Sequence, residues 1–371
     1  MEKELHMTAV SFNLQPFKLH FAKCVFDKHW SGNDVQVFKS IRTKMMQDNV
    51  LRWGVIGCGS VTEVKSVPAY QQTDGFEVYA VMRRNHELAL DYAKRHNVSH
   101  VHKSAEALIS DPNIDAVYIA TPPDTHLEYA LAVANVGKIC CIEKPLSPSF
   151  EESQQIYDAF EKRKIPLFVA YYRRSLPLFN AIKEVVDSGK IGKVRHVAWH
   201  YCRPASELDR SKEYNWRTDK NIATGGYFDD LASHGLDIFA YLFGDYSDAK
   251  GIGSNQLGLY SSYDSVSATW QHKSGVTGTG VWNFGSYTRV DEVIVYGSEG
   301  EIRFSIFRDQ DAQVITPTDV FELQHPYPKH IQKFHVENMQ SALLDNKSHP
   351  STGLTALHTS WVMDKILNKI A

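Results

Sequence analysis

Short apolar runs alternate with amphipathic segments through the first half of the chain. The runs predict strands, and the segments, whose apolar residues recur at helical spacing, predict helices. Because the early runs are apolar throughout, we expect a parallel sheet that is covered on both faces and joined by right-handed crossovers. The expected strands are 51–57, 76–82, 114–120, 139–142 and 166–172, and the expected helices are 61–72, 85–96, 105–109, 124–136 and one that a capping box opens at Ser149.

The pattern changes after Arg174, where alternating strands and turn residues replace the regular order of strand and helix. Strand-rich stretches of this kind favour a mainly antiparallel sheet. The predicted fold is therefore α/β: a doubly wound Rossmann domain at 51–173, followed by an α+β domain with a large, mainly antiparallel sheet at 174–371. Its expected elements are strands at 194–202, 265–270, 276–282, 292–295 and 302–307, a helix around Asp230, and amphipathic helices at 330–344 and 353–366.

Residues 1–50 follow neither period. They mix charged residues with scattered aromatic ones and contain no uninterrupted apolar stretch, so a secretory signal is not indicated. We expect a poorly ordered N-terminal extension, or a start assigned too far upstream, because Met45 and Met46 lie just before the first strand.

Composition favours small-molecule chemistry. The 371 residues, 43% hydrophobic and 22% charged, suffice for two domains with separate cores. The net charge is -3 and the basic residues are not clustered, so neither a nucleic-acid partner nor a membrane surface is indicated. No apolar run approaches the roughly 18 residues of a membrane span. The 5 cysteines form no CxxC pair, which favours reduced thiols and a cytoplasmic location.

A glycine turn joins the first strand to the following helix. Backbone amides at such a turn can face the pyrophosphate of a dinucleotide, since the helix macrodipole favours negative charge there. The third position of the usual fingerprint is Thr62, which adds bulk where glycine or alanine is typical. The alternative is a turn in an α/β fold that binds nothing. The candidate cofactor contacts in the turn are Gly57, Cys58, Gly59, Ser60 and Val61.

The second strand ends without the acidic residue that usually accepts the ribose hydroxyls of NAD, about 20 residues beyond the fingerprint. Arg83 and Arg84 lie there instead. Guanidinium groups pair well with a 2′-phosphate, so this strand end favours NADP(H). NAD(H) stays possible if both arginines are simply solvated.

Two further signals carry candidate chemistry. Lys144 ends an apolar run and precedes Pro145, whose peptide bond is a candidate for the cis isomer. Asp230 and His234 are four residues apart and share one helix face. When hydride moves to or from a carbon that bears oxygen, a proton must also move at that oxygen. We assign charge stabilisation to Lys144, proton exchange to His234, and orientation of His234 or a grip on a substrate hydroxyl to Asp230.

Five short motifs stand out: Gly57-Cys58-Gly59, Thr121-Pro122-Pro123 with His126, Glu143-Lys144-Pro145, Trp216-Arg217, and the run that contains Asp230, His234 and Asp237. Together they resemble the Gfo/Idh/MocA oxidoreductases over about 51–370. The nearest likeness is to the 1,5-anhydrofructose reductase and dihydrodiol dehydrogenase branches. The resemblance implies a Rossmann domain followed by a sheet-rich substrate domain, with Lys144, Asp230 and His234 at the catalytic positions. It also implies cofactor or substrate contacts at Thr121, Pro122, Pro123, Glu143, Arg173, Trp216 and Arg217, with His126 beside the cofactor as a helix-start residue.

The expected function is hydride transfer between NADP(H) and a small sugar-like, polyol or carbonyl substrate. A glycosidase that keeps its nicotinamide bound is one alternative, and a non-catalytic cofactor sensor is another. The 17 histidines show no HExxH or Cys/His ligand spacing, so no metal is expected. By family likeness, the large sheet is expected to bury an interface in a homodimer or larger homo-oligomer.

Overall fold

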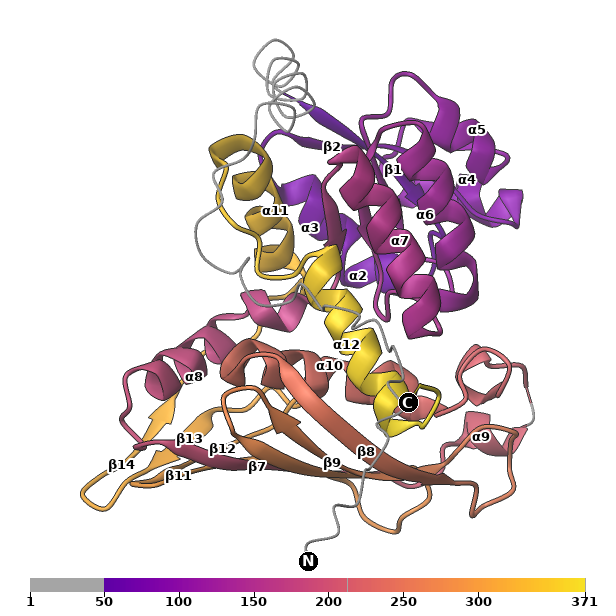
Figure 1. Ribbon diagram of the computed structural model, residues 1–371. Coiled ribbons are helices and arrows are strands. Elements are labelled where there is room, and N and C mark those ends of the chain that lie inside the picture. Colours follow the sequence, from indigo (N-terminus) through magenta and orange to yellow (C-terminus); the bar gives the residue numbers. More distant parts are fainter. Residues whose placement is uncertain (1–49, 212, 371) are drawn as a thin grey trace, which may run out of the picture.

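The computed structural model of the protein describes residues 50–211 and 213–370, which form two stacked domains (Figure 1). The extension predicted at 1–50 therefore lies outside the described residues, apart from Val50. Among the described residues, no helix has both the length and the apolar character needed to cross a membrane.

The first domain is built on a six-stranded parallel sheet in the order β3-β2-β1-β4-β5-β6, the order of a doubly wound Rossmann fold. Its strands are β1 (Leu51–Ile56), β2 (Phe76–Met82), β3 (His100–His102), β4 (Ala116–Ile119), β5 (Ile139–Ile142) and β6 (Leu167–Val169). Its helices are α2 (Ser60–Val64), α3 (Val67–Gln72), α4 (His86–Arg95), α5 (Ala105–Ser110), α6 (His126–Asn135) and α7 (Phe150–Arg163), with a 3-10 turn η1 (Pro123–Thr125).

Alternate residues of β1 are buried on opposite faces of this sheet. Trp53 and Val55 pack into an apolar cluster with α3 and α4, whereas Ile56 packs into a second cluster with α5, α6 and α7. Both faces are therefore covered, and the predicted fold class is confirmed. The helix expected at 61–72 is in two pieces, α2 and α3, because Pro68 has no N–H to donate to the carbonyl of Val64.

The second domain contains an eight-stranded sheet in the order β14-β13-β12-β11-β7-β10-β9-β8. Neighbouring strands are antiparallel except β7 and β10, which are parallel. The strands are β7 (Val194–Cys202), β8 (Tyr246–Ser254), β9 (Ser265–His272), β10 (Thr277–Asn283), β11 (Val290–Gly297), β12 (Glu301–Phe304), β13 (Ala312–Ile315) and β14 (Val320–Leu323). The helical elements of this half are η2 (Tyr172–Ser175), α8 (Pro177–Asp187), α9 (Glu207–Ser211), η3 (Trp216–Thr218), α10 (Tyr227–Phe243), α11 (Lys333–Asp345) and α12 (Gly353–Ile366).

The large sheet has one face turned toward the helices. α8, α10 and α12 lie between this face and the Rossmann domain (Figure 1). Trp199, Trp270 and Trp282 are buried on this face, within the apolar core of the domain. Gly235 lets α10 approach closely, because a Cβ at this position would lie 2.3 Å from the indole ring of Trp199. The buried face thus fixes the position of α10, which carries Asp230 and His234.

The two C-terminal helices join the domains. Val336, Met339 and Leu343 of α11 fill one apolar cluster of the Rossmann domain. α12 contacts α7 and β6 of the Rossmann domain and also α10 and β8 of the second domain. At the start of α7, the backbone N–H of Phe150 donates to Asp364 of α12 (2.7 Å). The end of the chain therefore packs on both domains.

Candidate active site

Lys144 and Asp230 meet where the domains adjoin. Lys144 follows β5, and its peptide bond to Pro145 is cis. The ammonium group of Lys144 pairs with one carboxylate oxygen of Asp230 and donates to its backbone carbonyl at 3.0 Å. The other carboxylate oxygen accepts a hydrogen bond from Nε of Arg217 (2.6 Å). One buried carboxylate therefore links a cation of the Rossmann domain to a cation of the second domain.

Two cations keep Asp230 ionised. Burial alone would raise the pKa of this carboxyl group, but the charges and hydrogen bonds of Lys144 and Arg217 outweigh burial and lower the pKa well below its ordinary value. Arg217 is itself held over the ring of Trp216, 4.5 Å from the ring centroid. Lys144, Asp230 and Arg217 thus form one polar cluster at the domain boundary. The positions of Lys144 and Asp230 in the sequence did not by themselves require this contact.

His234 lies one turn further along α10. Its Nδ1 is 2.7 Å from Nη1 of Arg173. Burial lowers the pKa of His234 well below its ordinary value, and the charges of Arg173 and Lys144 lower it further. The ring is therefore neutral at neutral pH. Arg173 contacts the ring directly, while Asp230 is bonded to Lys144 and Arg217. The role expected of Asp230, to orient His234 or to grip a substrate hydroxyl, stays a prediction.

Glu143 is buried just before Lys144. Its Oε1 accepts hydrogen bonds from the hydroxyl of Tyr118 (2.6 Å) and from the side-chain amide of Gln332 (2.7 Å). Its Oε2 accepts the backbone N–H of Lys144 at 3.3 Å. In the structure, Glu143 therefore anchors the loop that carries Lys144, and Gln332 is a site neighbour that the sequence did not reveal.

His126 is fully buried at the start of α6. Its Nε2 lies 2.9 Å from the carbonyl oxygen of Thr121, and its Nδ1 lies 3.1 Å from the carbonyl oxygens of Pro145 and Leu146. Burial lowers the pKa of this ring, despite the three carbonyl oxygens around it. The helix-start position is as expected, and the contacts show that His126 ties the Thr121 loop to the loop after Lys144.

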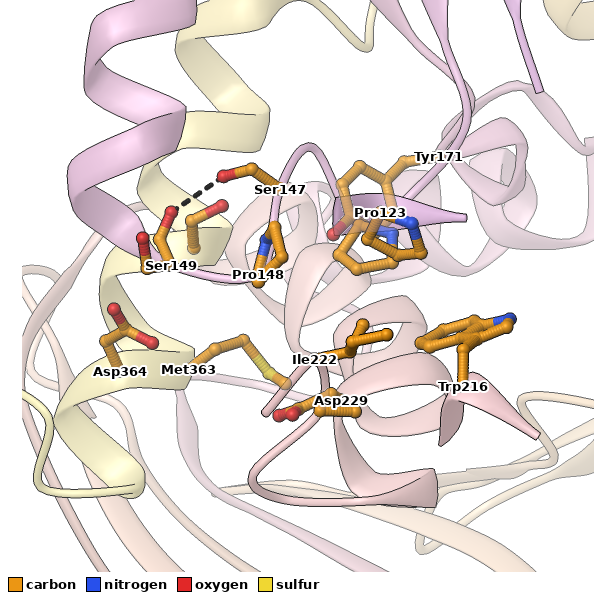
Figure 2. A pocket seen from close by; sticks show the side chains of 13 residues that line it. Pro123, Ser147, Pro148, Ser149, Tyr171, Trp216, Ile222, Asp229, Met363 and Asp364 are labelled. Atoms are coloured by element: carbon orange, nitrogen blue, oxygen red, sulfur yellow. Dashed lines mark hydrogen bonds between the residues drawn. The ribbon is translucent and has the colours of Figure 1, made fainter. Parts of the chain in front are cut away.

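A pocket opens beside these loops at the domain boundary (Figure 2). Pro123 and Trp216, two predicted contact residues, line it, whereas Pro122 lies in the same loop and its carbonyl oxygen accepts from Thr125 at 2.9 Å. Asp229, which the sequence analysis did not assign a role, also lines the pocket. Burial raises the pKa of Asp229 to about 6.

The glycine turn leaves room for a ligand. Gly57 has φ +94°, and a Cβ there would lie 2.7 Å from a side-chain carbon of Thr121. At Gly59 the space is open, because a Cβ there would meet no atom closer than the carbonyl oxygen of Gly57, at 4.0 Å. Thr62 is accommodated because its hydroxyl donates to the carbonyl of Gly59 (2.8 Å). The turn therefore fits close approach of a dinucleotide to its backbone.

The remaining predicted contacts surround this turn. Ser60 is exposed and Val61 is half-buried, whereas the side chain of Cys58 is buried. Arg83 donates to the carbonyl of Cys58 (3.3 Å), and Arg84 is exposed. In the part of the chain that the structure describes, no three His, Cys, Asp or Glu side chains are grouped so that they could hold a metal ion.

Comparison with known proteins agrees with this architecture. Residues 51–171 match the family described as "Oxidoreductase family, NAD-binding Rossmann fold", and 179–303 match "GFO/IDH/MocA C-terminal domain". An oxidoreductase of Formosa agariphila is 37% identical over 318 residues, 85% of this chain and 97% of the relative. The 1,5-anhydro-D-fructose reductase of Ensifer adhaerens is 27% identical over 228 residues, 61% of this chain and 67% of the relative.

A solved structure of levoglucosan dehydrogenase, in complex with NADH and levoglucosan, has the same overall fold. Its TM-score is 0.78 at 25% sequence identity, over 86% of this chain and 96% of that chain. The two family matches follow the order of the two domains in the chain. The 37% identical relative is matched over 97% of its length, so it spans both domains. This protein belongs to the Gfo/Idh/MocA family of NAD(P)-binding oxidoreductases.

Proposed function

We propose that the protein transfers hydride between a nicotinamide cofactor and a small sugar-like, polyol or carbonyl substrate. The observation that supports this most directly is the buried contact between Lys144 and Asp230, which places an ammonium group beside His234 at the domain boundary. The names of two relatives, levoglucosan dehydrogenase and 1,5-anhydro-D-fructose reductase, support a sugar-like substrate.

The reaction has a simple electrostatic requirement. When bound, the cofactor supplies or accepts the hydride. Negative charge then builds on the substrate oxygen, and a positioned donor to such an oxygen is worth roughly 3 to 4 kcal/mol. The ammonium group of Lys144, held in place by Asp230, is suited to stabilise this charge and to exchange a proton there. His234 is neutral and is suited to hydrogen-bond the same oxygen. We therefore propose proton exchange for Lys144, in place of the exchange at His234 that was expected from the sequence.

We further propose that the cofactor is NADP(H) in preference to NAD(H). The support is the pair Arg83 and Arg84 at the end of β2, where a carboxylate would select the unphosphorylated ribose. Arg83 already contacts the turn through the carbonyl of Cys58. The solved relative binds NADH, so NAD(H) is the competing cofactor.

A panel of sugars, polyols and carbonyl compounds, followed at the absorbance of NADPH and NADH, tests the function. Lys144→Met and His234→Ala should each lower kcat by about 10² to 10⁴-fold on the active compound. Lys162→Met is the matched control, since Lys162 is an exposed residue of α7. Unchanged rates in both site variants would contradict the assignment. Turnover without net change of the cofactor would favour the glycosidase alternative.

A further inference from the structure

We infer that Arg173 is a positioning residue that fixes the protonation of His234. It holds the ring neutral with its single proton on Nε2, so that His234 acts as a hydrogen-bond donor to the substrate oxygen and Lys144 is the proton carrier. The assignment of these two roles rests on the proposed function. The state of the ring itself follows from the contacts and does not depend on any substrate.

The first step is the direction of the hydrogen bond. Nη1 of Arg173 lies 2.7 Å from Nδ1 of His234. A guanidinium group has five N–H donors and no acceptor, and it stays protonated in proteins. Nδ1 must therefore accept. A neutral imidazole carries one proton, which consequently lies on Nε2, the nitrogen on the far side of the ring.

The second step is the rigidity of Arg173. Its Nε donates to the carbonyl of Ile306 (2.8 Å), and its guanidinium carbon lies 4.9 Å and 4.8 Å from the ring centroids of Tyr172 and Phe307. The residue is only 4% exposed. The guanidinium group is therefore held through Nε and by two aromatic rings. Arg173 cannot turn away from His234 without losing the hydrogen bond to Ile306 or the contacts with both rings.

Aromatic rings also hold His234. Tyr171, Tyr172 and Phe307 contact it edge to face, with centroids 6.2, 5.6 and 5.8 Å away. A flip of the imidazole would replace Nδ1 by a C–H group opposite Arg173 and would break the 2.7 Å contact. The packing therefore selects one orientation of the ring as well as one tautomer.

The third step is charge. Among residues 50–211 and 213–370, no carboxylate forms an ion pair with Arg173, in contrast to its neighbour Arg174, which is paired with Asp237. The charged groups that act on the ring of His234 are Arg173, Lys144 and Lys65, all of them cations. A positive charge on the ring is therefore opposed by three neighbouring cations, and the ring is a poor proton acceptor.

The roles of the two groups then separate. In carbonyl reduction, the reduced nicotinamide, when bound, would release the hydride from one of its own C–H bonds. A new C–H bond forms at the carbonyl carbon, and the π electron pair moves to oxygen. An N–H bond of the Lys144 ammonium breaks, its proton goes to that oxygen, and the neutral amine takes up a proton from solvent. Throughout, the Nε2–H group of His234 donates to the same oxygen and keeps its proton. Oxidation is the reverse of these steps.

Nitrogen NMR of the protein labelled with ¹⁵N-histidine tests the ring directly, without substrate. The His234 signals, identified by their loss in His234→Ala, should show an unprotonated Nδ1 and a protonated Nε2 from pH 5.5 to 8. Arg173→Lys retains a donor and should preserve this pattern. Arg173→Met should lose it and should allow the ring to gain a proton or exchange tautomers within that range. A proton on Nδ1 in the parent protein would overturn the inference.

Kinetics on an active compound supply a second readout. Arg173→Met should lower kcat/KM by about 100-fold and should add a pH-dependent step between pH 5.5 and 8 that the parent lacks. Arg173→Lys should recover most of the rate and the parental profile. A fall in rate with an unchanged profile and an unchanged NMR pattern would make Arg173 merely structural. If no compound in the panel reacts, the proposed function fails, but the NMR pattern still decides the protonation of His234.

Discussion

At the scale of single residues, Arg83 and Arg84 are the side chains that bear on cofactor choice. Arg83 is half-buried against the carbonyl of Cys58, whereas Arg84 is exposed at the same strand end. A hydrogen bond to a charged group is worth about 1.5 to 3 kcal/mol, so each arginine can contribute a tenfold difference or more between NADPH and NADH.

We expect Arg84→Ala to raise the Kd of NADPH about tenfold and to leave the Kd of NADH nearly unchanged. Titration of the nucleotide fluorescence measures both constants. Arg195→Ala, an exposed arginine on β7, is the control for general loss of charge. Tighter binding of NADH than of NADPH by the parent protein would contradict the preference for NADP(H).

The site was only partly predictable at this scale. Lys144, Asp230 and His234 could be proposed together because each motif is chemically distinctive and the family resemblance links them. The contact of Arg173 with His234 could not be foreseen, since it depends on how η2 packs against α10. The same holds for Gln332, which reaches Glu143 from the segment before α11. Such contacts depend on tertiary packing between distant segments, which produces no repeating pattern of apolar and polar residues in the sequence.

At the scale of elements, the approach of α10 to the large sheet depends on Gly235. We expect Gly235→Ala to destabilise the protein by about 1 to 3 kcal/mol, because the added Cβ would lie 2.3 Å from the indole of Trp199. The midpoint of urea unfolding measures this loss. Gly59→Ala is the control, since its Cβ would meet no heavy atom closer than 4.0 Å. Equal midpoints for both variants would contradict this account of the packing.

Several strongly patterned elements were predicted, although α8, a clearly amphipathic helix, was not. The strands expected at 76–82 and 139–142 coincide with β2 and β5. β8 and β14 were not predicted, because both are edge strands with largely exposed or partly exposed residues and little apolar alternation. The parallel pairing of β7 with β10 is also invisible in the sequence, which gives strand positions but not their order in a sheet.

At the scale of the whole molecule, the outer face of the large sheet suggests assembly. In the described part of the chain, no helix covers this face (Figure 1), and it presents Val281 and Tyr296, which are 41% and 38% exposed. We propose a homodimer through this face. Light scattering should give about twice the 42.1 kDa chain mass, and Val281→Arg should shift it toward the monomer. Leu90→Arg is the control, since Leu90 is an exposed apolar residue of α4 in the Rossmann domain, away from this sheet. A monomeric parent protein would contradict the proposal.

Buried histidines determine how stability responds to acid. Burial lowers the pKa of His272 and His349 from 6.5 to about 4. Between pH 6.5 and about 4, the unfolded chain binds protons that the folded chain does not. The free energy of unfolding therefore decreases as the pH is lowered, by up to about 1.4 kcal/mol per pH unit for each ring. Asp229, with its pKa raised to about 6, acts in the opposite sense, as do Asp237, Asp364 and Glu152, whose pKa values burial also raises. The histidines with a lowered pKa outnumber these carboxyl groups.

We therefore expect the urea midpoint to be lower at pH 5.5 than at pH 7.5. His335 adds to this trend, since burial lowers its pKa as well. Unfolding followed by tryptophan fluorescence at both pH values measures the change. A midpoint that is constant or higher at pH 5.5 would show that these rings are protonated in the folded protein.

The return of α11 to the Rossmann domain affects how the protein can be divided. A fragment that stops at residue 173 would lack Val336, Met339 and Leu343 and would expose the apolar surface that they cover. A fragment that starts at residue 174 would carry the same three side chains with nothing to pack against. Neither half is therefore expected to be stable when expressed alone, although mixing the two halves should restore the missing contacts and yield a nicked but native complex.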